Sequence, residues 1–473
     1  MSAFEITSRL GPSHADEPRA TTRLELATLP AYQASLDCVH CGFCLQSCAT
    51  YQVTGLEPSS PRGRIVLMKA FAEGRITLEG ESARHLDDCI GCRACEPVCP
   101  AGVRYGEMLE VVREARSERA AAAATAAPAT VATRLRDLAL DWLPHRTATR
   151  LVANTLRLYR RSGVAALAHR RGWIASLPPA LRMMEGLVPA QLAPPLRTST
   201  VAVRMEARRA ASTTAPRTRV ALFRGCIGDA LFPDVNQAAA ALLDLYGFDV
   251  VPVPDQTCCG ALDLHAGRSG RALALVRRNL DAFEEAGLGA PGGIELVAST
   301  AAGCGAMLRD LSRHFDDAPG VRAAAKRFEV RVRDVTELLA GGTPRAAPGP
   351  LRASATYHPP CHLHHAQRVT EAPLALLRTI PELTLVPLER AELCCGSGGL
   401  YNVLRPAMAD RVLDDKLAAI DATGASLLVT GNPGCHLHIA AGLRARGREV
   451  RVVHPLSLLA LAHGVAPRQA SSS

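Results

Sequence analysis

The chain has 473 residues, 48% of them apolar, and a formal net charge of +9. This length and composition predict a globular protein of several domains, each large enough to bury its own core. No stretch approaches the roughly 18 apolar residues of a transmembrane helix, and residues 1–20 lack the apolar segment of a secretory signal. We therefore expect a cytoplasmic location, with peripheral contact at the inner face of the membrane as a further option.

The cysteines divide the chain into two parts. Eight of the 16 cysteines precede residue 100, eight follow residue 225, and none lies between. Disulfides are rare in a reducing compartment, where clustered cysteines more often bind metal or take part in catalysis. Two different cysteine chemistries are therefore expected.

Residues 1–35 are expected to form an N-terminal leader with a short helix at Thr22–Tyr32. A ferredoxin-like segment follows at residues 36–115. This segment contains two cysteine runs with the same spacing. Three cysteines at intervals of three can wrap three irons of a cubane, and in two-cluster ferredoxins the fourth cysteine of each run binds the other run's cluster. One expected [4Fe-4S] site therefore consists of Cys38, Cys41, Cys44 and Cys99. The other consists of Cys89, Cys92, Cys95 and Cys48. Two structural zinc sites are the alternative, although zinc modules usually have two separate Cys-x2-Cys pairs.

Residues 116–217 form a basic helical linker region. Between residues 131 and 219 there are 16 arginines, no lysine and four acids. Arginines and apolar residues interleave as in an amphipathic helical segment broken at Pro144, and the prolines from Pro178 onward predict an irregular stretch. Such a segment docks on an anionic membrane surface or an acidic subunit, or packs against neighbouring domains with a solvated basic face. Aromatic residues make up only 4% of the chain, which argues against nucleic-acid stacking.

An α/β domain is expected at residues 218–345. Apolar strands are predicted at 219–224, 249–253 and 294–299, with helices at 236–245 and 268–286 between them, a pattern typical of a parallel sheet covered on both faces. Cysteines follow each strand, and the carboxyl ends of parallel strands form the ligand crevice. Four thiols are therefore expected to converge there: Cys226, Cys258, Cys259 and Cys304.

The same order repeats at residues 346–465, followed by a tail at 466–473. Strands are predicted at 354–358, 383–387 and 426–430, and the thiols that follow them are Cys361, Cys394, Cys395 and Cys435. The first interval spans 32 positions in one half and 33 in the other, and the last spans 45 and 40. This internal duplication predicts two similar halves packed with their crevices facing.

Together these motifs resemble the iron–sulfur subunit family of bacterial glycolate oxidase. The resemblance rests on the segments Cys38-Val-His-Cys-Gly-Phe-Cys44, Pro61-Arg-Gly-Arg-Ile65, Pro100-Ala-Gly-Val-Arg-Tyr105, Thr300-Ala-Ala-Gly-Cys-Gly-Ala306 and Cys394-Cys-Gly-Ser-Gly-Gly399. It implies an α+β multi-domain protein: a helical ferredoxin-like N-terminal domain with two [4Fe-4S] clusters, a helical linker and duplicated α/β parallel-sheet CCG domains. It also implies an electron-transfer subunit that receives electrons from an FAD-binding subunit oxidising glycolate and passes them toward a quinone. No catalytic residue is then expected on this chain.

The CCG halves depart from one branch of these relatives. In heterodisulfide reductase subunits a CCG domain can end in Cys-x-x-Cys, whereas Cys304 and Cys435 each stand alone. A further cluster in each half, a redox-active thiol set and a structural cysteine cluster all stay open. Six histidines near Cys361 and Cys435 are candidate ligands or tuning groups: His358, His362, His364, His365, His436 and His438. The alternative functions are an iron–sulfur subunit of a lactate or glycerol-3-phosphate dehydrogenase, and a heterodisulfide-reductase-like thiol/disulfide enzyme.

Overall fold

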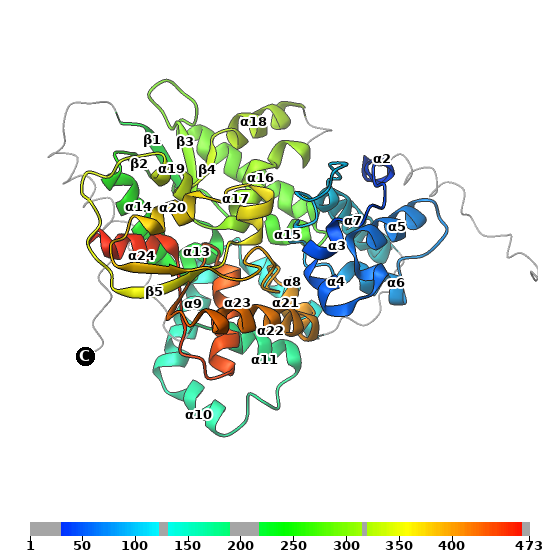
Figure 1. The fold of residues 1–473 in the computed structure, drawn as a ribbon. Helices are drawn as coiled ribbons and strands as arrows, with labels where there is room; N and C mark the ends of the chain where they lie inside the picture. Colours follow the sequence, from blue (N-terminus) through cyan, green and yellow to red (C-terminus); the bar gives the residue numbers. More distant parts are fainter. Residues whose placement is uncertain (1–29, 123–130, 190–216, 315–318, 466–473) are drawn as a thin grey trace, which may run out of the picture.

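The computed structural model describes residues 30–122, 131–189, 217–314 and 319–465 (Figure 1). The expected helix at Thr22–Tyr32 lies outside these residues except for its end, which overlaps helix α2. The N-terminal part is helical, and its elements are α2 Pro30–Leu36, α3 Cys44–Ser47, α4 Ala49–Thr54, η1 Glu57–Ser59, α5 Pro61–Ala72, α6 Gly80–Asp87 and α7 Tyr105–Ala122. None of the helices in the described ranges has the length and apolar character needed to cross a membrane.

Helix α5 shows how the local sequence starts a helix in this domain. Ser60 accepts a hydrogen bond from the backbone N–H of Gly63 at 3.0 Å, and Pro61 occupies the first helical position, which suits its fixed φ and missing N–H. The inner face of α5 packs with α7 around Met68, Met108 and Leu109, which are almost completely buried. The two cysteine runs lie around this small core.

The described part of the linker contains four helices of its own: α8 Val131–Trp142, α9 Arg146–Arg161, α10 Val164–Arg170 and α11 Pro179–Leu187. Of these, α10 and α11 lie at the bottom of Figure 1. The break at Pro144 is found as predicted. The prediction of an irregular stretch from Pro178 onward is wrong for residues 179–187, which form α11. Pro179 takes the first position of this helix, where proline is tolerated. Residues 190–216 lie outside the described ranges.

The first CCG half contains a four-stranded parallel sheet in the order β2-β1-β3-β4. Its strands are β1 Arg219–Phe223, β2 Asp249–Val251, β3 Leu296–Ser299 and β4 Val332–Asp334. The helices around it are α13 Cys226–Leu231, α14 Pro233–Leu245, α15 Ala261–His265, α16 Ser269–Glu285, α17 Ala302–Arg309, η2 Leu311–His314, α18 Pro319–Glu329 and α19 Val335–Ala340.

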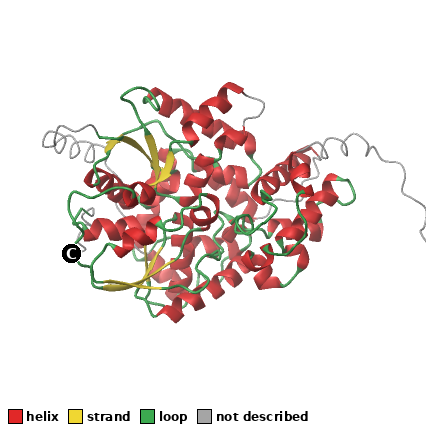
Figure 2. Cartoon of the chain, turned by 45° about the horizontal axis from the view of Figure 1, so that its top comes forward, coloured by secondary structure: helices red, strands yellow, loops and turns green. Residues whose placement is uncertain are grey.

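The second half repeats this topology in a separate sheet, ordered β6-β5-β7-β8 (Figure 2). Its strands are β5 Ala353–Tyr357, β6 Leu383–Val386, β7 Leu427–Val429 and β8 Arg451–Val453. Its helical elements are η3 His362–Ala366, α20 Ala372–Arg378, α21 Tyr401–Leu404, α22 Pro406–Thr423, α23 Pro433–Ala445 and α24 Pro455–Ala462. The predicted fold class is confirmed, and β4 and β8 are the strands that the sequence did not predict.

The two halves share one apolar core and meet at their cysteine-bearing ends. Buried side chains of both sheets, of α14 and of α24 belong to the same apolar cluster. Next to it, Asn432 accepts a hydrogen bond from the backbone N–H of Gly303 at 3.2 Å, and His454 contacts the carbonyl oxygen of Thr300 at 3.1 Å. The loops after β3 and β7 are therefore in contact, which excludes an arrangement with the two cysteine sets on opposite surfaces.

Candidate metal centres

The two cysteine runs of the N-terminal domain have the same backbone conformation. The second residue after the first cysteine is left-handed in both runs, with φ of 55° at His40 and 75° at Gly91. The fourth residue after the first cysteine is left-handed as well, with φ of 87° at Gly42 and 60° at Arg93. Residues other than glycine rarely adopt this backbone conformation, and they keep it only where the surrounding structure imposes it. The shared turn directs the thiols of each run to one side.

Each run faces a cavity that also receives a thiol from the other run. The first cavity is lined by Cys38, Cys41 and Cys44 together with Cys95 and Cys99. The second is lined by Cys89, Cys92 and Cys95 together with Cys48. These groupings contain the two crossed sets expected from the spacing. Cys95 borders both cavities, so the two candidate centres are neighbours.

A buried arginine supplies a test of whether a negatively charged group fits the second cavity. The Arg64 side chain is 1% exposed and lines that cavity. It donates hydrogen bonds to the carbonyl oxygen of His85 at 2.6 Å and to Oγ1 of Thr50 at 3.0 Å, and one nitrogen lies 3.8 Å from Sγ of Cys48. Among the described residues no carboxylate pairs with Arg64. An uncompensated buried charge costs several kcal/mol, so thiolates binding an anionic cluster fit this position.

The groups around Arg64 also favour its charged form. Burial alone would lower the pKa of this guanidinium, but Cys89, Tyr105 and Cys48 raise it overall. Tyr105 is itself buried and borders both cavities. Burial, followed by the charge of Cys89, raises the pKa of the Tyr105 phenol, and a hydrogen bond between the hydroxyl and the Cys89 thiol adds to this shift. The phenol therefore lies at the boundary of the two sites, beside one of the thiols of the second.

The thiols of the first CCG half are in direct contact with one another. Sγ of Cys226 lies 3.5 Å from Sγ of Cys258, and Sγ of Cys259 lies 3.4 Å from Sγ of Cys304. Asn279 on α16 holds the loop, because it accepts from the N–H of Thr257 and donates to the carbonyl oxygen of Cys258. The hydrogen bond between Cys226 and Cys258 raises the pKa of Cys226 and lowers that of Cys258. One thiolate within this set is thus stabilised by its neighbouring thiol.

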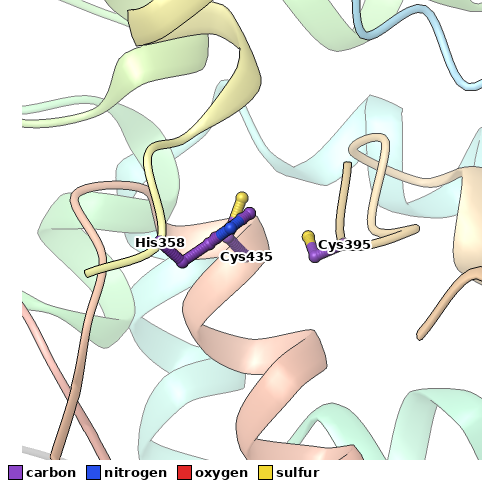
Figure 3. Close-up of side chains that lie close together, drawn as sticks. All are labelled: His358, Cys395 and Cys435. Atoms are coloured by element: carbon purple, nitrogen blue, oxygen red, sulfur yellow. The ribbon is translucent and has the colours of Figure 1, made fainter. Parts of the chain in front are cut away.

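The second half adds a histidine to its thiol set. His358, Cys395 and Cys435 are all buried, and their potential ligand atoms lie within 4.8 Å of one another (Figure 3). His358 follows β5, Cys395 follows β6 and Cys435 lies in α23 after β7, so the three come from the carboxyl ends of adjacent strands. Cys394 contributes to the pKa of Cys361 through a hydrogen bond, and the pKa of Cys361 is raised.

The second cavity of the N-terminal domain touches this set of thiols. The hydrogen bond between Cys92 and Cys394 is the main reason that the pKa of Cys92 is raised. Around this contact Ile90 packs with Tyr401 and Cys394 in a small apolar cluster. The Tyr401 hydroxyl also donates to the carbonyl oxygen of Asp88 at 3.0 Å. Thiols of the N-terminal domain and of the second CCG half therefore form one continuous group.

The structure separates the six candidate histidines. His358 joins the thiols, whereas His362 contacts the carbonyl oxygen of Gly91 and His365 contacts that of Glu392. The others have different neighbours: His364 packs on His365, His436 packs on the ring of Phe232 and His438 contacts Asn402. Sequence reasoning did not single out Arg64 or Tyr105 as site residues, although both belong to motifs that it quoted.

Comparison with known proteins identifies the family. Residues 34–103 match the family model of a 4Fe-4S dicluster domain, and residues 132–188 match the linker region of the glycolate oxidase iron–sulfur subunit. Residues 220–309 and 355–440 match the cysteine-rich CCG domain. The probable glycolate oxidase iron–sulfur subunit of Bacillus subtilis is 36% identical over 443 residues, which cover 91% of this chain and 94% of that protein. The chain belongs to the glycolate oxidase iron–sulfur subunit family.

Other relatives agree with this family and show its range. The glycolate oxidase iron–sulfur subunit of Escherichia coli is 31% identical over 420 residues, covering 87% of this chain and 91% of that protein. Lactate utilization protein A of an Exiguobacterium strain is 32% identical over 247 residues, covering 51% of this chain and 96% of that protein. As a member of the glycolate oxidase iron–sulfur subunit family with a matched dicluster domain, the chain binds [4Fe-4S] clusters and is an electron-transfer component of an oxidoreductase with other subunits.

Proposed function

We propose that this chain carries electrons within a complex that oxidises glycolate to glyoxylate, from an FAD-binding subunit toward a quinone. The observation that carries the proposal is the chain of neighbouring thiol groups. The two cavities of the N-terminal domain share Cys95, and the second one meets the second CCG half where Cys92 contacts Cys394. Such a series of adjacent centres suits electron transfer more than substrate chemistry.

The proposed ligands follow the crossed grouping. Cys38, Cys41, Cys44 and Cys99 hold one cluster, and Cys89, Cys92, Cys95 and Cys48 hold the other. A bound [4Fe-4S] cluster accepts single electrons, which lets it take over the two electrons of a flavin one at a time. The chain's own residues position the thiolates through the paired left-handed turns. Arg64 balances negative charge at the second site, where Cys48, Cys89 and Cys95 are buried, whereas Cys41 of the first site is exposed.

The linker supplies the proposed contact with a membrane that contains the quinone. Most arginines of α9 are used internally: Arg146 donates to the carbonyl oxygen of Pro254 and Arg157 to that of Ala230. The linker also has exposed apolar side chains: Leu158 on α9 is 68% exposed, and Trp173, which follows α10, is 55% exposed. Exposed arginines lie near them in the sequence, namely Arg161, Arg170 and Arg171. Exposed apolar side chains combined with basic residues fit an anionic lipid surface.

We also propose the following division of the chain. Residues 36–115 form the cluster domain, residues 116–217 the linker, residues 218–345 the first CCG domain and residues 346–465 the second. The short segments 1–35 and 466–473 are the leader and the tail. The contacts of α9 with α13 and of α11 with α21 and α23 support a linker that is packed against both CCG domains.

The experiment is anaerobic reduction of the purified complex. The chain is co-expressed with the FAD-binding subunits of a glycolate oxidase, and the absorbance of its clusters is followed after glycolate, lactate or glycerol 3-phosphate is added. Bleaching by glycolate at a rate faster than by the other two supports the proposal. Bleaching by lactate or glycerol 3-phosphate alone assigns the chain to a related complex, and a chain that never co-purifies with a flavoprotein contradicts the electron-transfer assignment.

The thiol contacts in the first CCG half favour a second candidate, a thiol/disulfide enzyme. Sγ atoms 3.4 and 3.5 Å apart need only a small movement to form disulfides. Iron and thiol counts on the chain alone distinguish the two functions. About eight irons per chain correspond to the two N-terminal clusters alone. Cleavage of a small disulfide substrate by the isolated chain would support the second function.

A further inference from the structure

Three arginines from two parts of the chain lie close together where the linker meets the first CCG half. Arg146 and Arg150 lie one turn apart at the start of α9, and Arg224 follows β1. Helix α9 packs against α13, which begins two residues after Arg224 (Figure 1). Like charges four residues apart on a helix repel each other, and the sequence of α9 contains no acidic residue. The start of α9 therefore carries two positive charges that its own sequence does not compensate.

One buried carboxylate lies beside these guanidinium groups. Asp229 on α13 is 8% exposed, and its oxygens lie 3.6 Å from a nitrogen of Arg150 and 3.9 Å from a nitrogen of Arg224. Both distances exceed that of a hydrogen bond, and Oδ1 of Asp229 has no hydrogen-bond partner in the described ranges. Arg146 donates to the carbonyl oxygen of Pro254 at 2.6 Å, and this neutral acceptor leaves its charge unbalanced. Three positive charges therefore surround one negative charge.

The pKa values of two of these arginines agree with this excess of positive charge. Burial lowers the pKa of Arg146, and the charge of Arg224 lowers it further. Burial also lowers the pKa of Arg224, because the charge of Asp229 only partly offsets the effects of burial and of Arg150. Asp255, another acid near Arg146, is exposed and has less influence on it than Asp229. A partly buried group of cations without enough counter-charge is costly, and a bound anion would remove this cost.

From this arrangement we propose that the junction of α9 and α13 binds the phosphate group of a small molecule through Arg146, Arg150 and Arg224. Guanidinium groups stay charged and donate paired hydrogen bonds to phosphate oxygens. A phosphate monoester carries about −1.5 to −2 charges at pH 7 and three terminal oxygens, which match the excess of two positive charges and the three arginines. The Arg150 side chain is 41% exposed and that of Arg224 15% exposed, so the ligand enters from the side of Arg150. The site is independent of the electron-transfer assignment, because no electron passes through it.

The test is an anaerobic calorimetric titration of the full, cluster-loaded chain with inorganic phosphate, at an ionic strength held constant with chloride. The wild-type chain is expected to bind one phosphate. Arg150→Gln is expected to weaken this binding at least tenfold, because it removes a positive charge and a charge-assisted hydrogen bond. Asp229→Asn is expected to bind phosphate several-fold more tightly, because it removes the competing carboxylate. Arg134→Gln changes an exposed arginine on α8, and this control should bind phosphate as the wild-type chain does.

The opposite responses of Arg150→Gln and Asp229→Asn separate a specific site from the general attraction of anions to a basic protein. A wild-type chain that shows no saturable binding of phosphate overturns the proposal. Equal binding by Arg150→Gln and Arg134→Gln overturns it as well, and so does weaker binding by a folded Asp229→Asn chain. Thermal unfolding and iron content show whether each variant is folded. If Asp229→Asn fails to fold, the comparison of Arg150→Gln with Arg134→Gln still decides the question.

Discussion

A guanidinium nitrogen of Arg64 lies 3.8 Å from the sulfur of Cys48, and both side chains are buried. Cys48 belongs by sequence to the first cysteine run, yet it lines the cavity of the second run. Arg64 therefore lies against the thiol with which the first run reaches the cavity of the second. A fixed positive charge there stabilises the more negative, reduced form of a bound cluster, because the buried site is poorly screened by water.

Arg64→Gln is expected to lower the reduction potential of one cluster and leave the other nearly unchanged. For a one-electron couple, a tenfold fall in the ratio of reduced to oxidised cluster corresponds to a potential about 59 mV lower. The reduction potential is expected to fall by at least this amount. Redox titration followed by electron paramagnetic resonance measures it. Arg64→Lys keeps the charge and should recover most of the potential.

The matched control for this charge is Arg62, two residues away. Its side chain pairs with Glu57 at 2.6 Å and is partly exposed, so its charge is already compensated and screened by solvent. Arg62→Gln should therefore shift neither potential by a comparable amount. Equal shifts in Arg62→Gln and Arg64→Gln, or a shift of both clusters together, would contradict a local role for Arg64.

Crossed ligation makes a second prediction about single cysteines. Cys41 belongs to the first site and Cys92 to the second whether or not the ligands cross. Cys99→Ala should therefore resemble Cys41→Ala in the cluster signal that it loses, and Cys48→Ala should resemble Cys92→Ala. Each variant is expected to fall from about eight irons to about four. Iron analysis with electron paramagnetic resonance checks this, and the opposite pairing of spectra would show that each run holds its own cluster.

The sequence predicted most of the fold because its signals are local. The strands ending before Cys226, Cys258 and Cys304 are apolar runs bounded by turns, and all were found within a few residues of their expected positions. Strands β4 and β8 were missed because each has three residues and includes an arginine. They exist through pairing with β3 and β7, which local periodicity does not show.

The candidate site was likewise predictable only where its signal in the sequence is local. Cysteine spacing alone grouped the N-terminal thiols, because spacing along one turn is a local property. The contact of Cys92 with Cys394 and the placement of His358 beside Cys395 depend on how distant segments pack. His358 was one of six candidate histidines, and only the three-dimensional structure distinguishes it from His362 or His365.

Asp334 gives a pH-dependent prediction for stability. It caps α19, where it accepts a hydrogen bond from the N–H of Thr336 at 2.9 Å. Burial raises its pKa from 3.8 to about 6, despite the hydrogen bonds from Thr336 that lower it. The folded state therefore binds a proton more tightly than the unfolded state, so stability is lost as the pH rises through about 6. A shift of this size corresponds to a few kcal/mol, roughly 1.4 per unit.

Asp334→Asn keeps the oxygen that caps the helix and removes the charge. At about pH 8 this variant should be more stable than the wild-type chain, and its advantage should shrink toward about pH 5.5. Thermal unfolding of the cluster-loaded chain across this range measures the difference. Asp281→Asn on the exposed face of α16 should show no such trend. An advantage that does not vary with pH would show that the Asp334 carboxylate is not the cause.

The exposed face of the linker makes the last prediction. If Leu158, Trp173 and the flanking arginines bind an anionic lipid surface, the complex should sediment with phosphatidylglycerol vesicles and not with neutral ones. Salt screens such attraction, with a Debye length of about 10 Å at 0.1 M, so binding should fall several-fold as salt rises. Leu158→Glu should weaken it further, since the change removes apolar area and adds a repelling charge.

The control for the apolar change is Leu461→Glu, which alters a leucine on α24 that is 54% exposed and lies outside the linker. It should leave vesicle binding unchanged. Binding that is insensitive to salt, or lost equally in both variants, would rule out electrostatic docking of this face on lipid. In that outcome, protection of Leu158 and Trp173 from labelling only in the assembled complex would identify the face as a subunit contact.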